Sequence, residues 1–198
     1  MNLQGEDSVR IGKISLLLCA LILVMTACAP KLRGIDLGKD RSPDFRLNDA
    51  RGESVALSDY RGKVVVLSFL YTNCLDECPL IASKLRSVAN QLGDSMKQVA
   101  YVAVSVDPEY DTPAAVQEFL QVHNLDGKMR YLIGTKEQLE PIWKAYYVGT
   151  LSNASSVNPV AHTTRTLIID KQGNQRIELG TIFDPADAVY NVRALLAE

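Results

Sequence analysis

The hydrophobic positions of this chain follow two patterns, continuous apolar runs and apolar residues at helical spacing. Residues 63–71 (KVVVLSFLY) and 98–107 (QVAYVAVSVD) are continuous runs rich in β-branched side chains. Such runs are typical of strands buried on both faces of a sheet. After each run, apolar residues recur at helical spacing, over 80–92 and 112–123. This order predicts two successive strand–helix units.

Capping residues set the expected bounds of the two helices. Proline is favoured at the first position of a helix, so Pro79 predicts that the first helix begins there, with Cys78 as its N-cap. Gly93 is expected to end it. Thr112 is the expected N-cap of the second helix, and Pro113 its first residue.

Shorter elements surround these two units. They are a hairpin of FRLND and SVALSDY around ARGE, a strand at 129–134, a helix opened by the capping box Thr135–Gln138, a hairpin of TRTLIID and NQRIELG around KQG, and a last helix from Asp184. Residues 148–162 form a long polar stretch that fits no element and is expected to be a functional or mobile loop. The pattern predicts an α/β fold, a central mixed β-sheet flanked by helices with an N-terminal β-hairpin extension.

The first thirty residues differ from the rest. Residues 14–25 form an apolar run that is too short to span a bilayer and follows two cations, as in an export signal. The run ends in VMTAC, which resembles the lipobox of bacterial lipoproteins, with Cys28 as the lipid-bearing residue. An uncleaved short anchor with an incidental cysteine is the alternative. Either way we expect a membrane-tied domain that faces the periplasm or the extracellular side.

This interpretation divides the chain into a signal peptide at 1–27, a membrane tether at 28–42 and one domain at 43–198. The formal net charge of −2 gives no basic excess that would indicate a nucleic-acid partner. Of the four cysteines, Cys19 leaves with the signal and Cys28 serves the anchor. Cys74 and Cys78 are then the thiols of the domain. A domain of this size does not need a disulfide for stability, so a single pair indicates a reactive or metal-binding role rather than a structural disulfide.

The spacing of Cys74 and Cys78 bears on that chemistry. Three residues separate them, whereas dithiol oxidoreductases of the thioredoxin kind use two. On a helix their Cβ atoms would be about 5–6 Å apart, and a disulfide needs about 3.5–4.5 Å. A metal ion bridges the wider gap more easily, although a turn could still bring the sulfurs together. We also expect the N-terminus of the following helix to favour the thiolate of Cys78.

Thiolates are soft ligands that select Cu(I), zinc or iron–sulfur chemistry. A structural zinc site requires four ligands and an iron–sulfur cluster requires four cysteines, whereas three soft ligands are enough to coordinate Cu(I). We expect His162 to be the third ligand, because it ends the long polar loop just before TRTLIID. His123 lies on the apolar stripe of the second helix and is expected at the core rim or helix end. Asp107, which closes the second central strand, could tune the metal site or simply belong to a turn.

The chain resembles the SCO/SenC/PrrC family of copper-binding, thioredoxin-like proteins. The resemblance rests on FLYTNCLDECP (69–79), SVDPEYDTP (105–113) and His162 ahead of TLIIDKQGN, in the family's order and spacing. It implies a thioredoxin-like fold and a copper ion, Cu(I) and in some members Cu(II), bound by Cys74, Cys78 and His162. It also implies a metallochaperone, rather than an enzyme, that delivers copper to the dinuclear centre of cytochrome c oxidase subunit II.

Two alternatives and two departures qualify that expectation. Some family members are thiol–disulfide reductases that keep the cysteines of that subunit reduced, with Cys74 here as the attacking thiol. The peroxidases that share the fold carry a proline-led motif that TNC lacks. Ala161 stands where the family commonly has an acidic residue, and Leu75 where it often has proline. Neither change removes a ligand, but Ala161 removes a carboxylate that could orient the imidazole.

Overall fold

The computed structural model describes residues 30–152, 160–162 and 164–198, with the backbone alone for residues 150–152 and 160–162. Residues 32–198 form one compact unit. Its centre is an eight-stranded mixed sheet in the order β1-β10-β9-β4-β5-β6-β2-β3. Strands β4, β5 and β6 are parallel, and β9 is antiparallel to β4. The expected α/β fold is therefore confirmed.

The central strands are the two apolar runs. Strand β4 (Val64–Leu70) and strand β5 (Val99–Ser105) are buried at every position. Strand β6 (Met129–Ile133) pairs with β5, and the hairpins form from β2 (Arg46–Asp49) with β3 (Ser54–Ala56) and from β9 (Arg165–Ile169) with β10 (Gln175–Leu179). Short 3₁₀ turns follow β3 and α2, at Leu57–Tyr60 and Gly93–Gln98. Continuous burial on both faces explains why these runs lack alternation.

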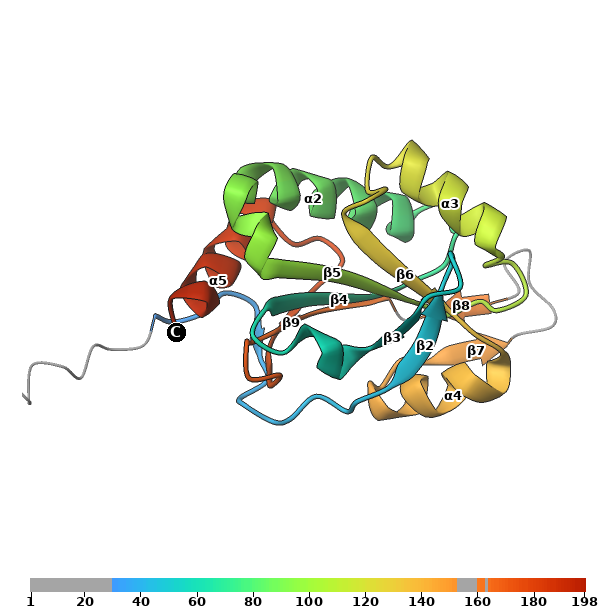
Figure 1. Cartoon of the computed structure of the whole chain (residues 1–198), viewed down its shortest axis with the longest axis horizontal. Helices are drawn as coiled ribbons and strands as arrows, with labels where there is room; N and C mark the ends of the chain where they lie inside the picture. Colours follow the sequence, from blue (N-terminus) through green and yellow to red (C-terminus); the bar gives the residue numbers. More distant parts are fainter. Residues whose placement is uncertain (1–29, 153–159, 163) are drawn as a thin grey trace, which may run out of the picture. The chain divides into compact units, whose positions relative to one another are not determined.

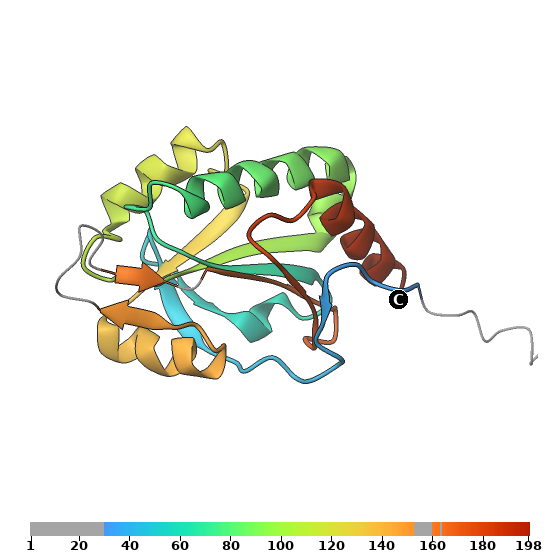
Figure 2. The same cartoon turned by 180° about the vertical axis from the view of Figure 1, so that it is seen from behind.

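Helices cover both faces of the sheet (Figures 1 and 2). Helices α2 (Glu77–Leu92), α3 (Pro113–Val122) and α5 (Pro185–Ala197) pack into one hydrophobic cluster. Helix α4 (Lys136–Ala145) packs into a second cluster on the opposite face. Three of the expected caps are present, since Thr112 accepts from Ala115 N–H, Asp184 caps α5 and Gly93 ends α2 with φ +53°.

Two segments differ from the expectation. The long polar stretch contains a short antiparallel pair, β7 (Thr150–Ser152) and β8 (Val160–His162), which lies at the end of the sheet where β4 and β5 end (Figures 1 and 2). The tether expected at residues 28–42 includes strand β1 (Ile35–Asp36), which pairs with β10. Ahead of it, Arg33 donates its N–H to the buried Asn191 of α5 at 2.8 Å, and Asn191 donates back to the Arg33 carbonyl at 2.6 Å.

Candidate metal centre

Cys74 and Cys78 lie together where strand β4 turns into helix α2. Helix α2 begins at Glu77, so Cys78 is its second residue and Pro79 its third. The expectation that Cys78 is the N-cap and Pro79 the first residue was wrong. The first four N–H groups of a helix have no acceptor within the helix, so proline fits at the third position without losing a bond.

A hydrogen bond joins the two cysteines. The backbone N–H of Cys78 donates to Sγ of Cys74 at 3.3 Å. Cys78 is fully buried and Cys74 is 8% exposed, and both are free thiols. The bond holds the sulfur of Cys74 against the first turn of α2, where backbone N–H groups and the helix dipole favour negative charge.

The two thiols differ strongly in acidity. A hydrogen bond from the Cys78 side chain, the N–H groups of Cys78 and Asp76, and the Tyr71 side chain lower the pKa of Cys74 to about 5. The pKa of Cys78 is raised, because its thiol donates to Cys74 and because it is buried. The expected thiolate at Cys78 was therefore wrong: the helix N-terminus stabilises the charge on the neighbouring sulfur, which lies outside the helix. The pair is a thiolate that accepts from a thiol, ready to bind a soft metal ion or to attack a disulfide.

A buried carboxylate, Asp111, holds the turn that carries Cys74. Asp111 is 3% exposed and accepts from the N–H and the hydroxyl of Thr72, both at 2.7 Å. Its other oxygen accepts from Ser105 at the end of β5 (2.6 Å) and from the Tyr131 hydroxyl on β6 (3.0 Å). Burial raises the pKa of Asp111 despite these donors. Sequence reasoning missed this residue, although it lies within the SVDPEYDTP block.

Asp107 lies two residues beyond β5, near the same end of the sheet. Its carbonyl accepts from Asp111 N–H at 2.9 Å, and its carboxylate accepts from the N–H groups of Glu109 and Tyr110. Burial, with the nearby Asp111, raises the pKa of Asp107. These contacts are those of a turn, and a role beside a metal stays a prediction.

The backbone of His162 ends strand β8, where it pairs with Thr150. The imidazole of His162 and the whole of Cys28 lie outside the described residues. Two residues after His162, the Thr164 hydroxyl donates to the carboxylate of Glu77 at 2.8 Å, next to Cys78 in sequence. This contact brings the chain near His162 to the first turn of α2. In the described part of the chain, no three His, Cys, Asp or Glu side chains are grouped to hold a metal ion.

His123 is the C-cap of α3, which confirms the expected helix-end position. Its ring packs on Phe119 with 4.5 Å between centroids. Burial, with the charge of Arg86, lowers the pKa of His123. His123 and Cys74 both line a pocket of about 430 Å³ between α2 and α3.

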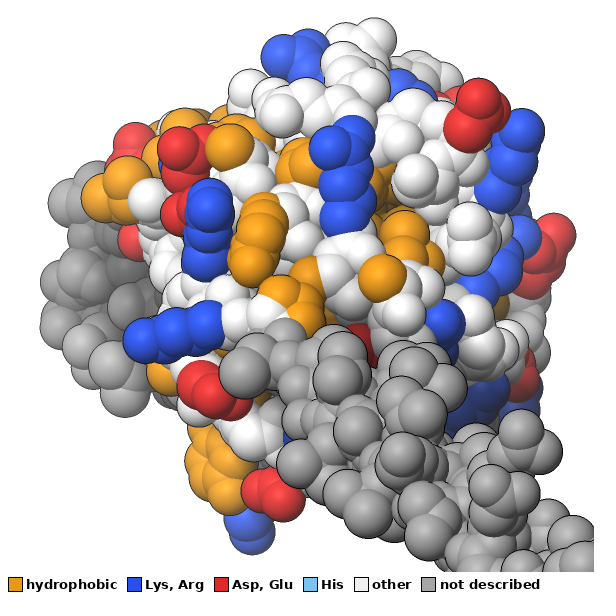
Figure 3. Space-filling view, turned by 90° about the vertical axis from the view of Figure 1, so that its left-hand side faces the viewer, with side chains coloured by type: hydrophobic (Ala, Val, Ile, Leu, Met, Phe, Trp, Pro, Cys, Tyr) orange, Lys and Arg blue, Asp and Glu red, His pale blue; other side chains and the backbone are white. Residues whose placement is uncertain are grey.

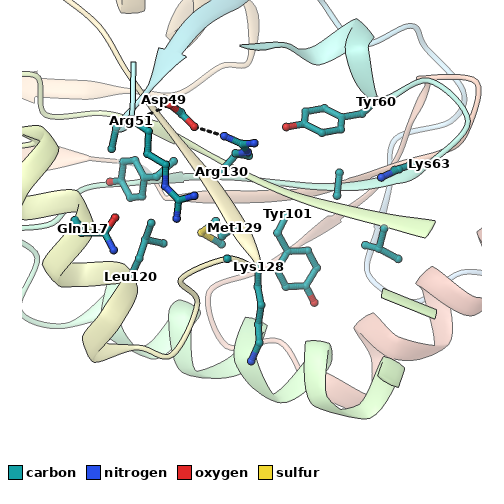
Figure 4. A pocket seen from close by; sticks show the side chains of 15 residues that line it. Asp49, Arg51, Tyr60, Lys63, Tyr101, Gln117, Leu120, Lys128, Met129 and Arg130 are labelled. Carbon is teal, nitrogen blue, oxygen red and sulfur yellow. Dashed lines mark hydrogen bonds and ion pairs between the residues drawn. The ribbon is translucent and has the colours of Figure 1, made fainter. Parts of the chain in front are cut away.

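A different pocket, of about 340 Å³, lies against the start of β5 and β6 (Figure 4). Its lining includes four cations, Arg51, Lys63, Lys128 and Arg130. Arg130 pairs with Asp49 and Glu53, and Arg51 pairs with Asp126 at 2.9 Å. These pairs neutralise the two arginines, and the pocket contains none of the thiol chemistry of the cysteine turn.

Comparison with known proteins decides the family. The model of the family described as SCO1/SenC matches residues 35–197. The chain belongs to the SCO1/SenC family. This membership confirms the resemblance carried by the cysteine turn, the SVDPEYDTP block and the late histidine.

Within the described residues, no helix is long and apolar enough to cross a membrane.

Similar proteins come from several bacteria. The SCO2-like protein RP587 of Rickettsia prowazekii is 29% identical over 133 residues, 65% of this chain and 64% of that protein, so the chain spans less than two-thirds of this relative. A SCO1/SenC family lipoprotein from Bacillus anthracis is 26% identical with a TM-score of 0.71, covering 85% of this chain and all of that one. The copper-bound ScoI of Bradyrhizobium japonicum is 25% identical with a TM-score of 0.63, covering 79% and 99%.

Proposed function

We propose that this SCO1/SenC protein is a copper chaperone, a binding and transfer protein that holds Cu(I) between Cys74, Cys78 and His162. The observation that carries the proposal is the hydrogen-bonded thiol pair, in which the pKa of Cys74 is lowered to about 5. A thiolate is already present at neutral pH, so a soft cation needs to displace only the proton of Cys78. The copper-bound state of the related ScoI supports the choice of metal.

The proposed recipient is the dinuclear copper centre of cytochrome c oxidase subunit II, and copper moves by ligand exchange. Thiolates of the recipient replace His162 first, because it is the one nitrogen ligand and comes from a separate segment of the chain. Cys74 is released next, since Cys78 is fully buried. The family's role in copper handling for cytochrome c oxidase assembly supports this choice of recipient.

Competition for Cu(I) tests the proposal. The whole chain, reduced and loaded with one equivalent of Cu(I), is titrated with a chromophoric cuprous chelator, beside the Cys74→Ser and Cys78→Ser variants. We expect each variant to lose copper to the chelator at a concentration that leaves the parent loaded. If the parent gives up its copper as readily as the variants do, the protein is not a copper carrier.

We also propose that residues 1–27 are a signal peptide and that Cys28 carries the lipid that anchors the protein outside the cytoplasm. The related lipoprotein of Bacillus anthracis supports this arrangement. Mass spectrometry of the mature chain checks it, because cleavage before Cys28 and acylation give one mass and an uncleaved anchor gives another. A Cys28→Ser variant should remain unprocessed and unlipidated.

A thiol–disulfide reductase is the second candidate, favoured by the acidity of Cys74. The Cys74 thiolate attacks a disulfide of the oxidase subunit and forms a mixed disulfide, which releases one partner thiolate. The Cys78 sulfur, having given up its proton, then displaces the second, so the partner gains two electrons and Cys74–Cys78 becomes a disulfide. This reaction needs no histidine, so metal-free turnover of a model disulfide by a His162→Ala variant separates it from copper transfer.

A further inference from the structure

A groove opens directly beside the sulfur that we assign to copper exchange. Its volume is about 430 Å³, and its wall includes Cys74, Pro79, Tyr110, Phe119, Val122 and His123. The cysteine turn and the start of α2 form one side, and α3, which lies next to the start of α2 in both views, forms the other (Figures 1 and 2). We call this groove, with the residues that line it, the turn groove.

The turn groove is apolar at its base and at its rim. Phe119 is 7% exposed at the base, whereas Val122 and Tyr110 are 66% and 53% exposed. Leu75, next to Cys74 in the same turn, is 83% exposed. Single exposed apolar side chains are ordinary, but Val122 and Tyr110 line the same pocket, and exposed apolar side chains grouped in this way favour binding of another molecule.

The two segments that line the turn groove carry charges of one sign. Residues 72–80 and 105–123, which supply its lining, contain no lysine or arginine, but they carry Asp76, Glu77, Asp107, Glu109, Asp111 and Glu118. Four of these six are exposed, and Glu118 itself lines the groove. Figure 3 views the opposite side of the folded unit, where β4 and β5 begin, and there lysine and arginine side chains lie among aspartate, glutamate and apolar side chains. Carboxylates therefore supply the fixed charge of these two segments, whereas Arg86 of α2 lies close enough to His123 in the groove wall to add to the effect of burial in lowering the pKa of that residue.

We propose that the turn groove seats an apolar side chain from a lysine- or arginine-bearing segment of the protein that exchanges copper with Cys74. The inference rests on the proposed function and names the partner surface for it. Cys74 is part of the groove wall, so an anchored side chain would place its neighbours in the partner beside the exchanging sulfur. The exposed carboxylates would attract a cationic segment and repel an anionic membrane surface.

Matched peptides test the groove without any copper. One synthetic peptide carries a tryptophan between lysines, a second has glutamates in place of the lysines, and a third has serine in place of the tryptophan. Binding is followed by amide shifts in NMR spectra of the metal-free, reduced whole chain. We expect the first peptide to shift Phe119, Val122 and their neighbours, and to bind about tenfold or more tightly than the other two.

Variants of the protein distinguish peptide binding in the turn groove from non-specific binding to the rest of the surface. Val122→Ser should weaken binding of the lysine–tryptophan peptide several-fold, whereas Ile35→Ser, a change at a similarly exposed apolar residue on the edge strand β1, should not. Glu118→Lys should weaken it and reduce its salt dependence, whereas Glu140→Lys on α4 should leave both unchanged.

The outcomes are distinct from those of the copper titration. Equal binding of the three peptides, no binding of any, or shifts confined to another face overturns the groove assignment even if the protein holds copper tightly. Shifts at Phe119 that depend on protein concentration alone would assign the groove to a second copy of the chain, and would also overturn it. Loss of copper binding with the peptide preference intact rejects the proposed function and leaves the groove as a protein-docking site.

Discussion

One oxygen of the Asp111 carboxylate accepts both the N–H and the hydroxyl of Thr72, each at 2.7 Å. Thr72 lies two residues before Cys74, and the other Asp111 oxygen is bonded to β5 and β6 through Ser105 and Tyr131. A single buried side chain thus ties the cysteine turn to two strands of the sheet. The position of Cys74 is set by this carboxylate as well as by helix α2.

Replacing Asp111 should loosen the turn. Asp111→Ala leaves the buried hydroxyls of Ser105 and Tyr131 and the N–H of Thr72 without acceptors, which should lower the free energy of unfolding by about 2–4 kcal/mol. Asp111→Asn keeps an oxygen for Thr72, and its amide can donate to the two hydroxyls, so it should cost less. Urea unfolding measures both, with Asp94→Asn, a 97% exposed carboxyl, as the control. Equal losses for Ala and Asn would mean that the charge, not the hydrogen bonds, matters.

Asp111 should also leave a signature in the pH dependence of stability. Burial raises its pKa in the folded state, so the folded protein binds this proton more tightly than the unfolded chain does. The stabilisation from the proton is complete in acid and is lost as pH rises from about 4 through the raised pKa. The stability of the parent relative to Asp111→Asn should therefore fall with rising pH. Urea midpoints between pH 3 and pH 7 test this, and a difference that stays flat with pH contradicts it.

The acidity of Cys74 predicts selective alkylation. In the reduced, metal-free protein, iodoacetamide should modify Cys74 with a rate midpoint near pH 5, while the fully buried Cys78 stays unmodified. Cys78→Ala removes the side-chain hydrogen bond that contributes most to the lowered pKa of Cys74, so the midpoint of the alkylation rate should move to higher pH. Mass spectrometry locates the label, and the same reaction in urea, where both thiols should react alike near the ordinary cysteine pKa, is the control.

The two histidines of the chain offer a matched pair for the metal site. We expect His162→Ala to weaken Cu(I) binding by at least about tenfold, since it removes the proposed nitrogen ligand. His123→Ala should leave affinity nearly unchanged, because that ring packs on Phe119 at the end of α3. X-ray absorption of the loaded chain should lose its nitrogen scatterer in the first variant alone. Identical affinity in His162→Ala and the parent would remove His162 from the site.

The segment before β1 should contribute to stability. Asn191 is fully buried and exchanges two hydrogen bonds with the backbone of Arg33. A chain that begins at Pro43 would leave that amide unpaired and would lose the β1–β10 pairing, so we expect it to unfold about 1–3 kcal/mol more easily than one that begins at Lys31. Thermal unfolding of the two chains makes the comparison. If both melt at the same temperature, the Arg33–Asn191 contact contributes nothing.

The sequence predicted the sheet and helices well because long apolar runs and caps are local signals. Strands β4 and β5, the Thr112 cap and both hairpins needed no knowledge of distant contacts. Strand β1 was missed because two exposed residues carry no pattern, and their pairing depends on β10, far along the chain.

The sequence predicted the chemistry of the cysteine site only in part. The spacing of Cys74 and Cys78 singled out the pair, but which sulfur carries the charge depends on the hydrogen bonds that the thiol and the N–H of Cys78 donate to Cys74. Asp111 was missed for a related reason: its importance comes from Thr72, Ser105 and Tyr131, which the fold brings together. Pairwise contacts between separate strands leave little trace in the local sequence.

The early start of the folded unit limits where the protein can act. If Cys28 carries a lipid, only residues 28–31 separate the bilayer from the unit that begins at Leu32. An extended chain covers about 3.3–3.6 Å per residue, so residues 28–31 span at most on the order of 15 Å between the lipid and Leu32. Leu32 would then stay within this reach of the lipid headgroups, and Cys74, which follows the end of β4, could stand farther from the bilayer only by the span of the folded unit itself.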